Sequence, residues 1–337
     1  MVMMTRVLLL SFALFGGISF ATAQTNVIAP PGVEEQVSVQ MTPAIPGPEE
    51  SVTIKLESFS ADLNKSYIVW TVNGVVKEEG PGVKSFSFTS AKLGVTQKVS
   101  VSITTEDKRS INKTFTIAPA KVGIVTEADT YTPPFYKGKS LFTPQAELKA
   151  VAMPEFIDAA GYKIPAENLI YTWKVDGKVN QGASGFGKSY FVTEGNLIPR
   201  PMYITVEVSA YNSSLIAAQT IEVIPEQPEI IFYEDSLFLG MRRAQAFTSG
   251  IDLSAKEIRL VAEPYFFSFN IPESADAKYT WALNGSPVSS LERPNVIGLE
   301  NRSGEAGIAM LSLNLEHLKN ILQLGTASLH IQFAATQ

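Results

Sequence analysis

A short phrase that contains tryptophan occurs three times in this chain of 337 residues, at 67–74, 171–177 and 279–285. These copies hold the only tryptophans, Trp70, Trp173 and Trp281, which stand 103 and 108 residues apart. A period near 100 residues matches the size of one small domain. We therefore expect three similar domains in tandem.

Each copy predicts a strand that ends in a tight turn. In the first copy Ile68, Trp70 and Val72 alternate with their neighbours, which is the pattern of a strand with one buried face. The phrase then runs into Asn-Gly or Asp-Gly, the strongest short-range signal for a hairpin. We expect Trp70, Trp173 and Trp281 to anchor the core of each domain.

Other short alternating segments surround each tryptophan strand and predict an all-β chain of antiparallel sandwiches. In the first domain they are Val52–Leu56, Phe86–Phe88, Val99–Ile103 and Thr114–Ile117, and the second domain repeats this order. Helical periodicity is confined to residues 315–324, which we expect to form a short helix inserted between two strands of the third domain.

Composition shifts and prolines predict the domain limits. Residues 24–45 are a leader or first edge strand, and the domains span 46–119, 120–225 and 226–337. The linkers Pro119-Ala120 and Pro225-Glu226-Gln227-Pro228 are short and stiffened by proline. We therefore expect the three domains to form a semi-rigid rod.

The first 23 residues predict export. Arg6 precedes the apolar run Val7–Phe20, which ends at the small-x-small site Ala21-Thr22-Ala23, so residues 1–23 are expected to be a cleaved signal peptide. The chain has no cysteine, which excludes disulfides, thiolate metal sites and thiol nucleophiles. Its net charge of −6 is spread thinly, without the basic block that nucleic-acid binding requires.

The third domain departs from the pattern of the other two. Only Ala334–Gln337 follow Phe333, too few residues for a turn and a further strand, so this domain is expected to lack a closing strand. An unpaired edge invites strand addition. Our hypothesis is that a partner, a neighbouring copy or the leader supplies the strand, and the alternative is a capped or truncated edge.

The Tyr-Thr-Trp strands closed by Asp-Gly or Asn-Gly, repeated in tandem in an exported chain, resemble bacterial immunoglobulin-like or PKD-like repeats. The resemblance covers most of residues 40–335. It implies three tandem immunoglobulin-like sandwiches with a spacer, adhesion or recognition role at the cell surface. It brings no catalytic residues with it.

Candidate chemistry is sparse. Residues 182–189 match the phosphate-loop pattern G-x-x-x-x-G-K-[ST], but Tyr190-Phe191-Val192 predicts a strand where nucleotide binding needs a helix. His317 and His330 have no metal-ligand spacing. Acidic pairs such as Glu234-Asp235 are either calcium ligands or solvated charges, and we favour the second alternative. We expect no catalytic residues, cofactor, metal or nucleotide.

Aromatic residues outside the core are the stronger lead. Four of them precede the third tryptophan strand: Tyr265, Phe266, Phe267 and Phe269. Three more, Tyr131, Phe135 and Tyr136, lie near the start of the second domain. Either the first group binds a ligand, or it packs across the junction of the second and third domains.

These patterns predict an exported, non-enzymatic scaffold or adhesion protein of the cell envelope that contacts protein or glycan at the cell surface. After signal cleavage no further segment is apolar enough to span a membrane. The alternative is a carbohydrate-binding protein, or an accessory module array of a surface enzyme or pilus system.

Overall fold

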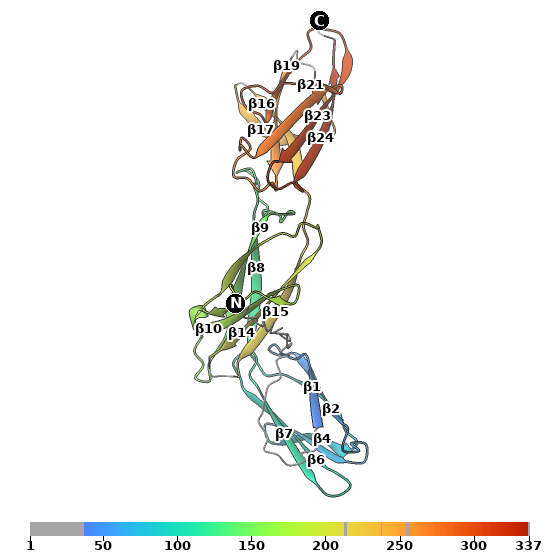
Figure 1. Ribbon diagram of the computed structural model, residues 1–337, viewed down its shortest axis with the longest axis vertical. Helices are drawn as coiled ribbons and strands as arrows, with labels where there is room; N and C mark the ends of the chain where they lie inside the picture. Colours follow the sequence, from blue (N-terminus) through green and yellow to red (C-terminus); the bar gives the residue numbers. More distant parts are fainter. Residues whose placement is uncertain (1–36, 212–213, 237, 254–256, 336–337) are drawn as a thin grey trace, which may run out of the picture.

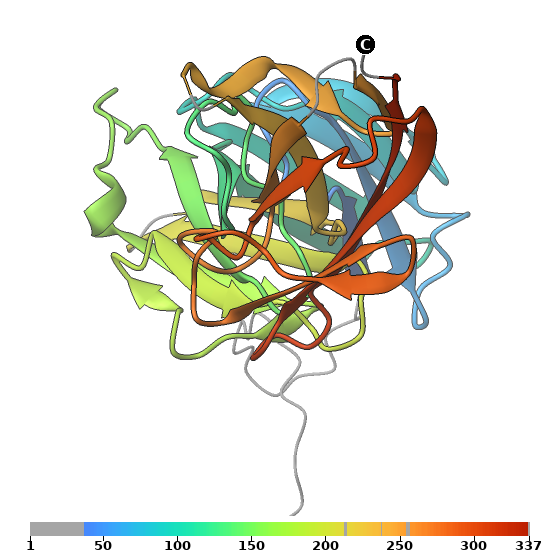
Figure 2. The same cartoon turned by 90° about the horizontal axis from the view of Figure 1, so that it is seen from above.

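The computed structural model describes residues 37–211, 214–236, 238–253 and 257–335, and these form three β-sandwiches placed end to end (Figure 1). Viewed along the long axis, the domains lie behind one another (Figure 2). The predicted signal peptide lies outside the described residues. Within those residues, no helix has the length and apolar character needed to cross a bilayer.

Domain 1 is built from seven strands in two antiparallel sheets. One sheet has the order β1 (Val37–Thr42), β2 (Ser51–Ser58), β5 (Ser85–Thr89). The other has the order β4 (Val75–Pro81), β3 (Tyr67–Val72), β6 (Gln97–Thr104), β7 (Ser110–Ile117). Ile54, Ile68, Trp70, Val99 and Ile103 are fully buried between them.

Domain 2 repeats this plan. Its first sheet has the order β13 (Tyr190–Glu194), β9 (Glu147–Glu155), β8 (Lys121–Asp129). The second has the order β11 (Lys178–Val179), β10 (Leu169–Val175), β14 (Met202–Ala210), β15 (Ile216–Val223), and β12 (Gly185–Phe186) also pairs with β10. A 3-10 turn at Ala166–Asn168 precedes β10.

Domain 3 has the same sandwich with additional strands. Its first sheet has the order β17 (Gly240–Phe247), β16 (Glu229–Ser236), β19 (Glu257–Tyr265), β22 (Val296–Glu300). The second has the order β18 (Gly250–Leu253), β24 (Leu324–Phe333), β23 (Gly307–His317), β20 (Ala277–Leu283), β21 (Ser286–Val288). The predicted fold class, all-β with three tandem immunoglobulin-like sandwiches, is confirmed.

The helix predicted at 315–324 is wrong. This segment holds the end of β23, a tight turn and the start of β24, and the turn is closed by His317 N–H donating to Gln323 O at 3.1 Å. Leu318, Ile321 and Leu324 have helical spacing but are all more than half exposed, so their spacing marks no buried helical face.

The third domain does have a closing strand, contrary to the sequence expectation. β24 pairs along its length with β23, from Gly307↔Phe333 to Glu316↔Leu324. Its other edge pairs in parallel with β18, from Gly250↔His330 to Leu253↔Phe333. The domain therefore covers this edge with a strand of its own, β18, and the hypothesis of a strand-addition partner at that edge is wrong.

In all three domains the tryptophan joins the two sheets. Each indole is at most 3% exposed, and its Nε1–H donates to a backbone oxygen at 2.9 Å. The acceptors are Val83, Lys188 and Pro294, each two positions before a strand of the opposite sheet, β5, β13 or β22. The tryptophan therefore fills the core and also fixes where the chain enters the facing sheet.

The turn after each tryptophan strand is held by a side chain. Asn73, Asp176 and Asn284 have φ of 50°, 49° and 52°, the left-handed conformation that a type I′ hairpin requires. Their Oδ1 atoms accept the backbone N–H of Lys98, Tyr203 and Met310, at 2.8, 3.0 and 2.8 Å. The turn residue thus pins its hairpin to the neighbouring strand.

Replacement of Trp173 by alanine should cost about 3–5 kcal/mol and unfold domain 2, because it removes a fully buried ring and the sheet-to-sheet hydrogen bond. Trp173→Phe should cost less, since it keeps most of the buried ring area and loses the donor. Hydrogen exchange by mass spectrometry on β10 and β14 of the full chain measures this. Unchanged protection in Trp173→Ala would contradict the role of the indole.

Domain 2 should lose stability in acid through Asp176. The Tyr203 N–H donated to its carboxylate holds the pKa of Asp176 below the ordinary 3.8, so the charged form is favoured in the folded state. This contribution is present above the ordinary pKa and is lost as the pH falls through the lower folded value. Asp176→Asn, which places the residue type of Asn73 at this turn, should flatten the dependence of domain 2 unfolding on pH below about pH 4, measured calorimetrically.

The reciprocal control is Asn73→Asp in domain 1. It keeps the acceptor for Lys98 N–H and adds the charge, so it should introduce an acid dependence into domain 1. Identical pH profiles for the wild type and both variants would show that the turn carboxylate has no such role.

Candidate functional site

The four aromatic residues singled out by sequence lie at the junction of domains 2 and 3, where they are buried. Tyr265, Phe266, Phe267 and Phe269 are 4%, 5%, 0% and 6% exposed. They form no exposed patch in this structure, so the prediction of a ligand-binding surface does not match their burial. Their position corresponds to the alternative, packing between domains.

The partner surface is a long connection of domain 2, residues 130–146 between β8 and β9, which we name the arm. It leaves the end of domain 2 and lies against domain 3 (Figure 1). Two features of the sequence indicate that this connection packs against something: it is long for a hairpin loop, and it carries four aromatic residues, Tyr131, Phe135, Tyr136 and Phe142. The sequence identifies Tyr131, Phe135 and Tyr136 as aromatic residues outside the core, but it does not predict that they pack on domain 3.

One part of the arm covers the outer face of the β16–β19 sheet. Phe135 meets Tyr233 edge-on at 5.4 Å between ring centroids. Tyr136 meets Tyr265 at 5.5 Å and Phe266 at 5.8 Å, again edge to face. Strand β19 is therefore buried on both faces, with Leu260 in the sandwich core and Val261 under the arm.

A second part of the arm adds backbone hydrogen bonds across the junction. Tyr131 N–H donates to Phe267 O and Phe266 N–H donates to Tyr131 O, both at 2.7 Å. The Tyr131 ring packs on Phe269 at 6.3 Å, and Phe269 stacks on Phe267 at 5.3 Å. Gly325 makes room for this stack, since a Cβ there would stand 2.9 Å from Phe267 Cζ.

Two glutamines complete the junction. Gln323 of domain 3 is fully buried, and its Nε2 donates to Pro144 O at 2.9 Å and Ser268 Oγ at 2.6 Å, while its Oε1 accepts Ser268 N–H. Gln145 of the arm accepts Leu322 N–H through Oε1 at 2.8 Å. No sequence pattern predicted these residues, because a buried amide is satisfied only by the chain segments that tertiary structure brings around it.

Backbone strain is concentrated at the same place. Phe266 and Gln145 have φ of +65° and +62°, which is uncommon for residues with a side chain. Such conformations persist where the surrounding contacts over-determine them. Here the hydrogen bonds and ring contacts described above provide that constraint.

One buried carboxylate belongs to the junction. Glu263 on β19 is 5% exposed, and its Oε2 accepts the hydroxyl of Tyr131 at 2.9 Å. Burial raises the pKa of Glu263, although the bond from Tyr131 opposes this shift. Burial and the nearby Glu263 also raise the pKa of Tyr131, so this phenol stays a donor.

His317 is a structural residue of the junction. Its Nδ1 accepts the backbone N–H groups of Lys319 and Asn320 at 3.2 and 3.1 Å, so Nδ1 carries no proton. Nε2–H then donates to Ser268 O at 3.0 Å. This ring holds the β23–β24 turn, whereas His330 is exposed on β24.

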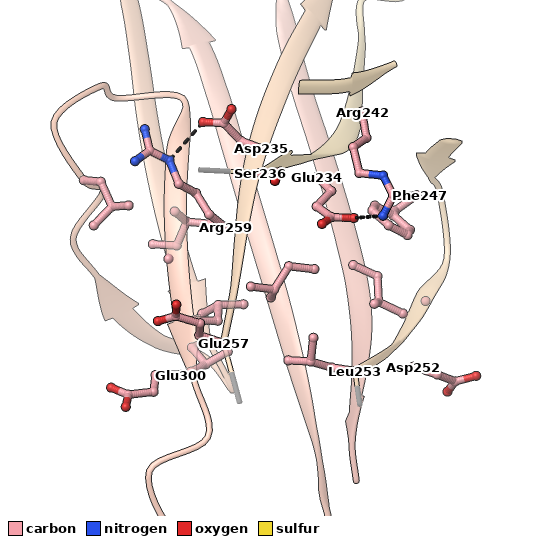
Figure 3. Close-up of a pocket in the computed structure, with 18 of the residues that line it drawn as sticks. Glu234, Asp235, Ser236, Arg242, Phe247, Asp252, Leu253, Glu257, Arg259 and Glu300 are labelled. Carbon is pink, nitrogen blue, oxygen red and sulfur yellow. Dashed lines mark hydrogen bonds and ion pairs between the residues drawn. The ribbon is translucent and has the colours of Figure 1, made fainter. Parts of the chain in front are cut away.

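A groove of about 1390 Å³ lies in domain 3, and none of the junction residues described above lines it. Figure 3 shows residues of this groove. Two ion pairs lie in it: Arg259 Nε lies 2.9 Å from Asp235 Oδ2, and Arg242 Nη1 donates to Glu234 Oε2 at 3.0 Å. Glu257 and Glu300 are cross-strand neighbours at its edge. Among the described lining residues we find no nucleophile with an adjacent base.

The remaining sequence motifs take structural places. In the phosphate-loop match, Ser184 Oγ accepts Trp173 N–H and Lys188 O accepts the Trp173 indole, and the strand β13 follows. Within the described ranges, no group of three or more acidic or histidine side chains is placed to hold a metal ion.

The junction of domains 1 and 2 is built differently. A Cβ on Gly94 of domain 1 would stand 2.8 Å from Ile157 Cβ of domain 2, so the two backbones approach closely there. Among the described residues no pair of aromatic rings joins domains 1 and 2, whereas four such pairs join domains 2 and 3. The two junctions therefore differ in kind.

Comparison with known proteins gives only distant likenesses. No family model matches the chain, and no curated protein matches it. Among solved structures, the three N-terminal domains of the bacteriophage RB49 Highly Immunogenic Outer Capsid protein are 12% identical, with 90% of this chain and 100% of that chain covered and a TM-score of 0.27. The central fibronectin-III array of RIM-binding protein is 12% identical, with 90% and 97% covered and a TM-score of 0.31. At these scores the fold assignment rests on the sheets themselves.

Glu263→Gln should stabilise the junction at neutral pH or leave it unchanged, because it keeps an acceptor for Tyr131 and removes a buried charge. The raised pKa means that, in the wild type, stability falls as the pH rises from the ordinary 4.5 through the folded value. The variant should lack this fall in calorimetric unfolding between pH 4 and 8. Tyr131→Phe should instead destabilise, by about 1–3 kcal/mol, since it leaves the carboxylate without its donor.

Proposed function

We propose that this chain is an exported, non-enzymatic scaffold or adhesion protein of the cell envelope, in which domains 2 and 3 act as one rigid unit. The observation that carries the proposal is the arm, whose rings and hydrogen bonds join these two domains. A spacer can hold a binding surface at a fixed distance and angle only if its domain junctions resist bending. The arm supplies that resistance at one junction.

Three further observations support this function. The first 23 residues have the features of a signal peptide, and a chain without cysteine needs no disulfide exchange after export. Two carboxylates of the domain 3 groove, Glu234 and Asp235, are held in ion pairs with arginine, which does not favour their use in acid–base catalysis. The alternative of carbohydrate binding loses its leading residues, because Tyr265 and its three neighbours are buried.

Rigidity can be measured with pairs of spin labels, since the absence of native cysteines allows clean labelling. Thr114, Gln219 and Ser328 are exposed positions on the last strands of domains 1, 2 and 3. The 219–328 distance distribution should be narrow and the 114–219 distribution broader. Phe135→Ser with Tyr136→Ser should broaden the first and leave the second unchanged.

A 219–328 distribution that stays narrow in the double variant would show that the arm does not fix the two domains. Export is tested separately, by whether a protein that begins at Gln24 is recovered outside the cytoplasm and whether removal of residues 1–23 abolishes this. Retention in the cytoplasm would reject the envelope role.

A further inference from the structure

The outer face of the β13–β9–β8 sheet in domain 2 exposes an apolar row that crosses all three strands. Val151 on β9 lies directly opposite Val125 on β8 and Tyr190 on β13. Val125 and Tyr190 are 57% and 56% exposed. Met153, also 56% exposed, extends the row along β9. Apolar side chains that lie side by side on an exposed sheet face, rather than singly, mark a candidate interaction surface.

The same row in domain 3 is covered. Ala152-Met153-Pro154 corresponds in sequence to Ala262-Glu263-Pro264, which places Val151 at the position of Val261. Val261 lies opposite Tyr233 on β16 and Val296 on β22, just as Val151 lies between β8 and β13. All three residues of the domain 3 row are at most 5% exposed, beneath the arm.

The corresponding outer face of domain 1 is covered by none of the described residues and has a different composition. Its rows are polar: Thr42, Thr53 and Ser87 lie in register, as do Gln40, Lys55 and Ser85. The apolar row of domain 2 therefore differs from its uncovered equivalent in domain 1 and agrees with its covered equivalent in domain 3.

Charge indicates what fits beside the row. The same face carries a row of three acidic residues: Asp129 on β8 lies opposite Glu147 on β9, which lies opposite Glu194 on β13. This acidic row is two positions along the strands from the row that contains Lys149, and Lys149 separates it from the apolar row. Like charges in register destabilise a sheet. Within the described ranges none of the three forms an ion pair, and together with Asn320 they line a hollow of about 440 Å³. A basic side chain would relieve this repulsion.

We propose that this face of domain 2 docks an extended segment of a partner protein that carries aromatic side chains followed by lysine or arginine. The arm sets the chemical precedent, since Phe135-Tyr136 cover the domain 3 row and are followed by Lys137 and Lys139. Lys149, whose Nζ lies 5.2 Å from the centre of the Tyr190 ring, is exposed and moves aside on docking. The proposal rests on the scaffold function and names its binding surface.

The arm of a second copy is a poorer occupant. Each arm is already held on its own domain 3 by the two Tyr131 backbone bonds and the Gln323 amide, which would have to break before it could bind elsewhere. A segment from another protein carries no such cost.

The experiment uses the full chain from Gln24 and, as the probe, a fluorescent peptide with the sequence of residues 130–141. Fluorescence anisotropy should show saturable binding. Val125→Thr with Tyr190→Thr should weaken it at least tenfold, because these changes keep strand-forming residues and remove the apolar row. Asp129→Asn with Glu194→Gln should weaken it and reduce its dependence on salt.

The matched control is Thr53→Val with Ser87→Val, which places an apolar pair on domain 1 without the acidic row and should leave the affinity unchanged. Absence of saturable binding would overturn the proposal. So would binding that the domain 2 variants leave intact, because the peptide would then be exchanging with the arm on domain 3. Neither result changes the distances between spin labels, so the scaffold function is tested independently of this docking proposal.

Discussion

The architecture depends on one interaction repeated three times, the buried indole that donates its N–H to the chain entering the facing sheet. A β-sandwich has to fix the relation between two sheets that share no ladder hydrogen bonds. In each domain the tryptophan does this by donating from a strand of one sheet to the residue two positions before a strand of the other. Its ring fills the gap between the sheets, and its single polar atom, which would otherwise be buried without a partner, donates to a backbone carbonyl.

Domains 2 and 3 are likewise joined by buried aromatic rings and backbone hydrogen bonds. Strand β19 carries buried residues on both faces, so its outer face needs a second layer. Domain 3 does not supply that layer itself, and the arm of domain 2 does. The strained backbone of Phe266 and the buried carboxylate of Glu263 are tolerated because the arm satisfies both. The stability of this face of domain 3 is thereby coupled to domain 2.

Several elements were predictable from sequence because their signals are local. Alternation around Trp70 and the Asn73-Gly74 turn depend on residues a few positions apart, and the structure has the strand and turn there. The helix at 315–324 was mispredicted for the same reason, since leucines with helical spacing also fit a strand end and an exposed turn. The β17–β18 insertion escaped prediction because a parallel pairing with β24 joins residues about 80 positions apart.

The sequence by itself determined the class of the chain, its period and its core anchors, because strand alternation, turn residues and tryptophan spacing are properties of short segments. Only the tertiary structure decided which apolar surfaces are covered. Val151 and Val261 occupy equivalent positions in similar sequences, yet one row is exposed and the other buried. The difference lies in a loop of the neighbouring domain, and burial depends on what packs against a residue rather than on the residue alone.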